Sequence, residues 1–177
     1  MRMRSWKAAV LGLALAILVG VALLATQSLD AGTATRAAAD VARGQYLTSI
    51  MHCAGCHTPG ALVGKPDPER WFAGSDVGFA LPDGGVVYPP NLTPDPETGL
   101  GHWSEEEIAR AVRQGQSRNG RVLVPVMPWP SYSVLTEVDA RAIAAYLKAV
   151  PAVRFAVPRS TRPGERPEAP YVSVVTP

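Results

Sequence analysis

The stretch Cys53-Ala54-Gly55-Cys56-His57 is the part of the sequence that most strongly predicts the fold of this chain. Two cysteines three residues apart lie on one side of a single helical turn, and the histidine follows directly. C-x-x-C-H is the attachment pattern of c-type haem, in which both thiols bond one edge of the porphyrin and the imidazole binds iron. The stretch therefore predicts one covalently bound heme c, with Cys53 and Cys56 as thioethers and His57 as the proximal iron ligand.

Two other roles of a C-x-x-C pair fit this sequence less well. A structural zinc site needs four ligands, and no second Cys/His pair has the right spacing. A redox-active dithiol is typical of a thioredoxin-like chain, but the surrounding sequence lacks alternating strand and helix patterns. Covalent haem is the favoured interpretation.

The distal iron ligand has to come from a different part of the chain. Met51 and His52 adjoin the motif and cannot reach across the ring, which leaves His102 and Met127. Met127 lies in the stretch VPVMPWP at 124–130, where three prolines stiffen the loop. His102 precedes a helix start and is favoured as a helix-entry or surface residue. We therefore predict Met127 as the distal ligand.

Ligation by His57 and Met127 has a chemical consequence. Six-coordinate iron offers no open position to a substrate, and a thioether ligand raises the reduction potential. The pair predicts a low-spin electron-transfer protein and not an enzyme.

The composition excludes several other classes of protein. The 177 residues contain 17 Lys+Arg and 15 Asp+Glu, a net charge of +2, which does not fit a nucleic-acid partner. Two cysteines exclude a disulfide-dense scaffold and a four-thiolate iron–sulfur site. Sixteen glycines and 17 prolines indicate long irregular loops.

The amino terminus carries an uncharged apolar run over residues 8–25. As a helix this run is about 27 Å long, enough to cross the hydrocarbon core of a bilayer. Arg2, Arg4 and Lys7 precede it and keep that end in the cytoplasm. A cleaved signal peptide is the alternative, but the clean small-x-small site at 37–39 lies well beyond the run, so a retained anchor is favoured.

The sequence predicts a four-part organisation. A transmembrane anchor at 1–27 (or signal peptide) precedes a linker at 28–39, a mainly α domain at 40–153 and an extended, Pro-rich tail at 154–177. The anchor places the domain on the periplasmic side of a bacterial cytoplasmic (inner) membrane.

Within the domain, three short helices and one hairpin are expected. The helices span residues 40–52, a segment capped by Ser104 and stopped at Gly115, and a segment from Thr136 to Pro151. The hairpin pairs 77–81 with 86–88. Apolar residues predict the buried face of the last helix: Val138, Ala142, Ile143, Tyr146, Leu147 and Val150. Three short helices do not offer enough apolar surface for the long loop at 58–101 to pack against. A bulky cofactor would supply that surface, which independently favours one.

With these residues assembled, the chain resembles the class I cytochrome c family. The features that carry the resemblance run from Asp40 to Val150: Gly44 and Tyr46, CAGCH at 53–57, PPNLTP at 89–94, the Met127 loop and AAYLK at 144–148. Other stretches, GSDVGF at 74–79, NLTPD at 91–95 and MPW at 127–129, are similar to membrane-associated bacterial cytochromes that accompany periplasm-facing dehydrogenases. Some of those carry three haems, whereas this chain has a single motif.

The resemblance implies two specific contacts. The first and last helices are expected to cross with Gly44 and Tyr46 against Tyr146 and Leu147, since a missing side chain permits close approach. A carbonyl of the Pro89-Pro90 segment, assigned to Pro90, is expected to accept the Nδ1–H of His57 and so orient the ring.

The same resemblance suggests roles for large and charged side chains near the haem. Trp71, Trp103 and Trp129 are haem-pocket or core-packing residues, with Trp71 and Trp129 assigned to the pocket. Arg118 and Arg121 either pair with a haem propionate or, as favoured, belong to a solvated loop.

The expected function is single-electron transfer at the membrane. The donor is a dehydrogenase or quinol-oxidising complex, and the acceptor is a terminal oxidase or soluble cytochrome of a respiratory chain. Two alternatives stay open: a fixed haem subunit of a larger respiratory complex, and a five-coordinate haem enzyme or sensor.

Overall fold

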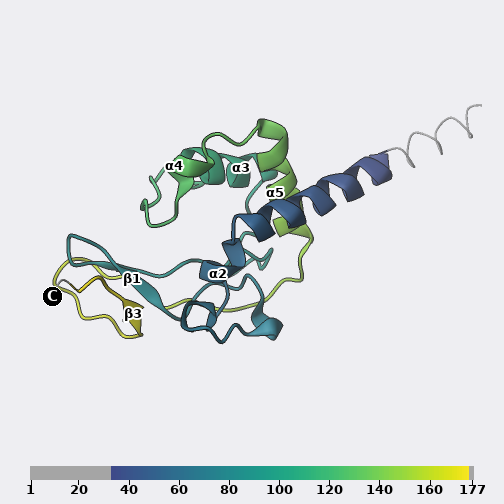
Figure 1. Ribbon diagram of the computed structural model, residues 1–177. Helices are drawn as coiled ribbons and strands as arrows, with labels where there is room; N and C mark the ends of the chain where they lie inside the picture. The colour runs from purple at the N-terminus through teal and green to yellow at the C-terminus, as the bar shows by residue number, and fades with distance from the viewer. Residues whose placement is uncertain (1–32, 176–177) are drawn as a thin grey trace, which may run out of the picture. The chain divides into compact units, whose positions relative to one another are not determined.

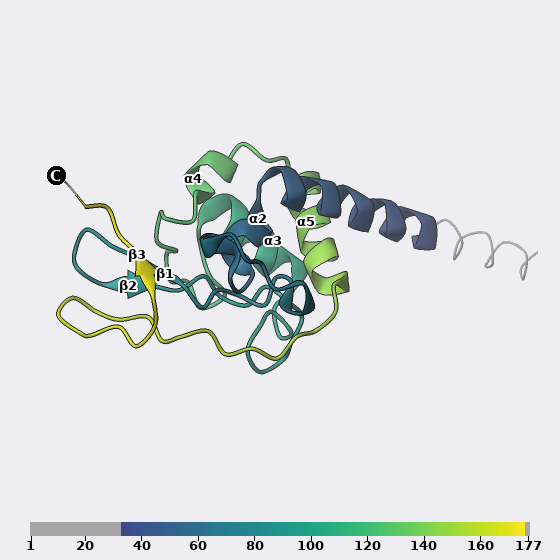
Figure 2. The same ribbon diagram turned by 60° about the horizontal axis from the view of Figure 1, so that its bottom comes forward.

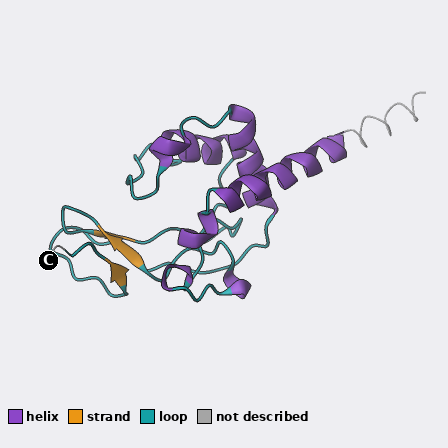
Figure 3. Ribbon diagram, in the orientation of Figure 1, coloured by secondary structure: helices purple, strands orange, loops and turns teal. Residues whose placement is uncertain are grey.

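The computed structural model of the chain describes residues 33–175 (Figure 1). A helix over residues 33–50 is followed by α2 (Cys53–His57), α3 (Glu105–Gln114), α4 (Trp129–Tyr132) and α5 (Glu137–Ala149). Single 3-10 turns form at Ala61–Val63 and Pro68–Arg70, and the strands are β1 (Gly78–Ala80), β2 (Val86–Val87) and β3 (Tyr171–Val172). Helices outweigh strands (Figure 3), so the predicted mainly α class is confirmed.

The chain divides into two compact units, Met1–Ala39 and Asp40–Pro177. The predicted membrane segment at 8–25 lies outside the described residues. Among residues 33–175, no helix has both the length and the apolar composition needed to cross a bilayer. Residues 33–39, predicted as linker, are helical; three of them are consecutive alanines, the residue with the highest helix propensity. All further description concerns the second unit.

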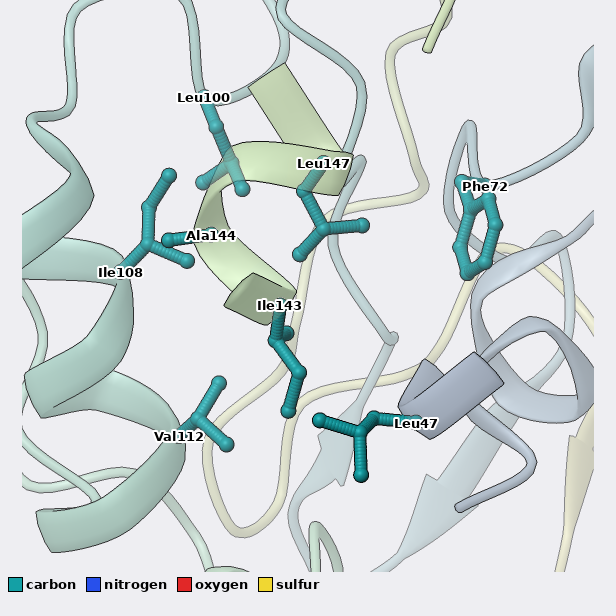
Figure 4. Packing of buried hydrophobic residues seen from close by; sticks show 8 residues of the cluster. All are labelled: Leu47, Phe72, Leu100, Ile108, Val112, Ile143, Ala144 and Leu147. Carbon is teal, nitrogen blue, oxygen red and sulfur yellow. The ribbon is translucent and has the colours of Figure 1, made fainter. Parts of the chain in front are cut away.

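One apolar core joins the helices of the second unit. Figure 4 shows Ile108 and Val112 of α3 on one side of α5 and Leu47 and Phe72 on the other. α5 is therefore the central element. It contributes three buried residues to this arrangement: Ile143, Ala144 and Leu147. Val138, predicted for the same face, is 65% exposed in the first turn of α5, so its predicted burial is wrong.

Gly44 brings the first helix against α5. A Cβ at Gly44 would lie 1.9 Å from the Ala142 carbonyl oxygen and 2.7 Å from Tyr146 Cβ, so only glycine fits. The expected contact of Gly44 with Tyr146 is confirmed. The expected role of Tyr46 is wrong: it is 61% exposed, and Leu47 is buried instead. Residues two apart on a helix face opposite sides, whereas residues three apart share one.

The predicted ends of α3 and α5 are confirmed. The Ser104 side chain accepts a hydrogen bond from the Glu107 backbone N–H, and the Glu107 carboxylate accepts one from the Ser104 N–H. Gly115 ends α3 at φ 63°, and the Thr136 side chain caps α5 by accepting from the Asp139 N–H. Both helices thus begin and end where their sequence signals place them.

Buried polar side chains organise the long loop at 58–101. Asn91, 1% exposed, donates from Nδ2 to the Val153 carbonyl (2.8 Å) and to Thr98 Oγ1 (2.9 Å). Its Oδ1 accepts from the Thr93 N–H and hydroxyl, both at 2.8 Å. The loop is therefore fastened by side-chain hydrogen bonds to the chain that follows α5, a feature that the sequence analysis did not predict.

A small sheet lies at the carboxyl-terminal end. The predicted hairpin is present, with Phe79 opposite Val87 and Ala80 opposite Val86. β3 adds to β1 in parallel, giving the order β2-β1-β3 (Figure 2). Thr161 also bridges to Val86. The segment after residue 153 is largely exposed, and backbone pairing joins it to the hairpin.

Candidate cofactor site

The C-x-x-C-H motif forms the single-turn helix α2. His52 precedes it in the left-handed conformation (φ 57°), which redirects the chain after the 33–50 helix. Cys53 and Cys56 are half-buried free thiols three residues apart on this turn. The two sulfurs and the imidazole of His57 therefore come from one rigid turn of helix.

His57 is held by a backbone carbonyl. Its side chain is buried, and Nδ1 lies 2.8 Å from the Pro90 oxygen. A carbonyl can only accept, so Nδ1–H donates, and Nε2 has no hydrogen-bond partner among residues 33–175. Burial lowers the pKa of His57, opposed by the hydrogen bond to Pro90, and leaves the ring neutral at pH 7. The expected hydrogen bond is present and leaves Nε2 without a partner among the described residues, so this nitrogen is available to bind a metal.

The neighbours of Pro90 fix the position of its carbonyl. The Pro89 oxygen accepts from the Ser75 N–H (3.0 Å), and the Leu92 N–H donates to the Phe72 oxygen (2.8 Å). Asn91, between them, makes the buried hydrogen bonds described above. The acceptor of His57 thus belongs to a rigid segment that is held on both sides.

The cysteine environment does not fit a reactive dithiol. Burial raises the pKa of Cys53 to about 11, and burial also raises the pKa of Cys56. Redox-active and nucleophilic cysteines have lowered pKa values instead. Within residues 33–175, no three His, Cys, Asp or Glu side chains gather in a way that could hold a metal ion. Two thiols plus an imidazole with a free Nε2 are the donor set of a covalently attached haem.

Met127 lies half-buried in the loop between α3 and α4. Its N–H donates to the Val124 oxygen (3.1 Å), and its own oxygen accepts from the Trp129 N–H (2.7 Å), so the backbone is locally fixed. Within the described residues no hydrogen bond joins Met127 to His57 or to either cysteine. His102, the alternative ligand, is exposed in the turn before α3.

Tyr132 on α4 connects the Met127 segment to the motif. Its hydroxyl donates to the Met51 oxygen (3.3 Å). The pKa of Tyr132 is raised by burial first and then by the charges of Cys53 and Cys56, which places the phenol near both sulfurs. The sequence analysis did not predict a role for Tyr132 near the motif, because nothing in the sequence distinguishes it from an aromatic residue of the core.

The tryptophans and arginines near the site have defined contacts. Trp129 Nε1–H donates to the Leu123 oxygen (3.1 Å), and its ring covers Gly115, where a Cβ would approach within 2.3 Å. Trp129 therefore packs the Met127 loop against the end of α3. Arg118 pairs with Glu107 at 3.4 Å, and Arg121 is exposed.

Trp71 lies on another part of the surface. It is 47% exposed and meets Phe72 edge to face, with ring centroids 6.0 Å apart. It lines a cavity of about 290 Å³ together with His52, Gly55 and Tyr146. Trp103 is partly buried against the core, and its oxygen accepts from Lys148 Nζ (3.1 Å). The pocket roles assigned to Trp71 and Trp129 stay predictions.

Comparison with known proteins agrees with this donor set. The family model described as "Cytochrome c" matches residues 41–151. The chain is 41% identical over 106 residues to a gluconate 2-dehydrogenase cytochrome c subunit of Pantoea cypripedii, covering 60% of this chain and 22% of that protein. It is 34% identical over 106 residues to the cytochrome c subunit of a quinone alcohol dehydrogenase of Gluconobacter oxydans, covering 60% and 20%.

A third relative carries more than one haem by name. It is a "Diheme cytochrome c-type" protein of Cereibacter sphaeroides, 38% identical over 118 residues that cover 63% of this chain and 36% of that protein. The chain thus spans between about a fifth and about a third of the length of these three relatives.

Proposed function

This chain belongs to the cytochrome c family, and from that premise we propose that it is a single-haem electron carrier whose iron is ligated by His57 and Met127. The observation that carries the proposal is the His57–Pro90 hydrogen bond of 2.8 Å, which orients a buried neutral imidazole beside two free thiols. The alternating ferric and ferrous states of a bound haem supply the redox chemistry.

The residues of the chain have separate tasks in this proposal. Cys53 and Cys56 fix the porphyrin through thioether bonds, so the cofactor cannot dissociate during turnover. Pro90 fixes the ring of His57 and raises its basicity as a ligand. Met127, on a loop stiffened by prolines, would supply the second protein ligand to the iron and so keep water and substrate away from it. Together they favour electron transfer over bond-making chemistry.

We assign one haem to the chain because it contains two cysteines and a single C-x-x-C-H motif. Relatives named as dehydrogenase cytochrome subunits support a dehydrogenase as the electron donor. The apolar run at 8–25 after three basic residues supports an anchor in the inner membrane of a bacterium, with the haem domain on the periplasmic side. A terminal oxidase or soluble cytochrome then accepts the electron.

Optical spectroscopy of the oxidised, full-length holoprotein tests the proposed coordination. We expect a low-spin spectrum with the weak far-red band of thioether-to-ferric charge transfer, because an iron held by both His57 and Met127 would have no open coordination position. Cyanide should bind slowly to the oxidised protein, and carbon monoxide should bind slowly to the reduced protein. A high-spin spectrum with rapid binding of either ligand would contradict the proposal and favour a five-coordinate haem enzyme or sensor.

A fixed subunit is the second candidate, favoured by the names of the relatives, which are subunits of dehydrogenases. Purification from native membranes in a mild detergent distinguishes it from a free carrier. A fixed subunit should co-migrate in constant ratio with a dehydrogenase or quinol-oxidising complex, whereas a carrier should elute alone. We expect the chain to elute alone, because electron-transfer encounters have small interfaces.

A further inference from the structure

A second cavity, of about 230 Å³, opens between α3 and α5. α3 and α5 pack side by side through their apolar faces (Figure 4), and the cavity lies where their polar residues meet. Its lining is rich in charge: Glu106, Ala109, Arg110, Arg113, Gln114, Glu137 and Arg141. None of these residues belongs to the proposed haem site. The cavity is therefore separate from that site.

The acidic groups of the cavity are already paired. Arg141 donates from Nη1 to Glu106 and from Nη2 to Glu137, each at 3.0 Å. Glu106 lies four residues before Arg110, the spacing of a helix ion pair, but its carboxylate contacts Arg141 instead. Three arginines against two glutamates leave the lining with an excess positive charge.

Arg110 and Arg113 carry that excess. Neither makes an ion pair with any residue in the described range 33–175. The Nε atoms of both are buried and have no hydrogen-bond acceptor there. Buried polar groups in native proteins almost always have a partner. The two side chains lie three residues apart and share one face of α3, so one ligand can contact both.

We propose that Arg110 and Arg113 together bind a small oxyanion, of the carboxylate or phosphate class, in this cavity. A guanidinium presents its N–H groups as a planar fork that matches the two oxygens of such an anion. A water molecule takes up about 30 Å³ of liquid, so the cavity of about 230 Å³ has room for a four-oxygen anion with hydrating waters. Arg141 keeps Glu106 and Glu137 from repelling it.

Thermal unfolding of the full-length holoprotein tests this site, followed by far-ultraviolet circular dichroism at pH 7. The probes are sodium phosphate and sodium acetate, each compared with sodium chloride at the same ionic strength. A ligand that binds only the folded state, present at a hundredfold excess over its Kd, should raise Tm by on the order of 5 °C. The variants are Arg110→Gln, Arg113→Gln and the control Arg121→Gln, which removes an exposed loop charge.

The proposal predicts that phosphate, acetate or both raise Tm in the parent and in Arg121→Gln, and that Arg110→Gln and Arg113→Gln lose most of the rise. A response to phosphate alone assigns the phosphate class, and a response to acetate alone assigns the carboxylate class. No rise in the parent, or an equal rise in all four proteins, overturns the proposal.

Discussion

Replacing Met127 with alanine is expected to abolish the far-red band of the oxidised holoprotein and to convert it from low-spin to high-spin. Alanine has no donor atom, so the sixth coordination position opens to water or added ligands. Cyanide should then bind the oxidised variant, and carbon monoxide the reduced variant, much faster than they bind the parent. The reduction potential should fall, because a thioether ligand favours the ferrous state and axial ligands tune haem potentials over a range of about 0.8 V.

A matched variant in the same loop separates ligation from packing. Val126 adjoins Met127 and is 43% exposed, so Val126→Ala removes a side chain of the loop without removing a sulfur donor. It should keep the far-red band and the slow ligand binding of the parent. If Met127→Ala also keeps them, Met127 is not the ligand. The exposed His102 is then the first alternative to test.

The features that sequence predicted well depend on local spacing. The Ser104–Glu107 capping box and the Thr136 cap are set by residues three apart, and both are present. The hairpin follows from the turn between two short apolar runs. Tyr46 shows the limit of such reasoning: a helical pattern predicts a face, but the contact with α5 selects Leu47 and leaves Tyr46 exposed.

The features that sequence did not predict depend on distant pairs. β3 pairs with β1 across more than ninety residues, as Gly78 opposite Tyr171, and no local signal indicates which strand a short extended segment joins. Likewise, no local signal in the sequence indicates that Tyr132 lies near Cys53 and Cys56. The hydrogen bond from His57 to Pro90 was expected only from the resemblance to class I cytochromes c, since 33 residues separate donor and acceptor.

Asn91 connects the segment that follows α5 to the loop that positions His57, the proposed iron ligand. The residue directly follows Pro90, and its amide joins the loop to the Val153 carbonyl at 2.8 Å. The apolar core includes Phe72 and Leu100 of this loop, and Leu92 packs against it, but none of these apolar contacts supplies a polar partner beside the acceptor of His57. We infer that the buried amide of Asn91 holds that acceptor in place.

Asn91→Ala is therefore expected to lower the free energy of unfolding by roughly 3–5 kcal/mol, because buried groups of Thr93, Thr98 and Val153 lose a partner without gaining water. Urea unfolding of the holoprotein measures this loss. Asn119→Ala is the matched control: Asn119 accepts from the Ser117 hydroxyl at 2.7 Å in an exposed loop, and its loss should cost about 1 kcal/mol or less.

The same variant should also change the reduction potential, since a looser Pro90 carbonyl weakens the hydrogen bond that makes His57 a basic ligand. Loss of stability alone leaves the potential of the folded fraction unchanged, so a redox titration distinguishes the two roles of Asn91. A variant that unfolds more easily but keeps the parent's potential would show that the amide stabilises the loop without positioning the ligand.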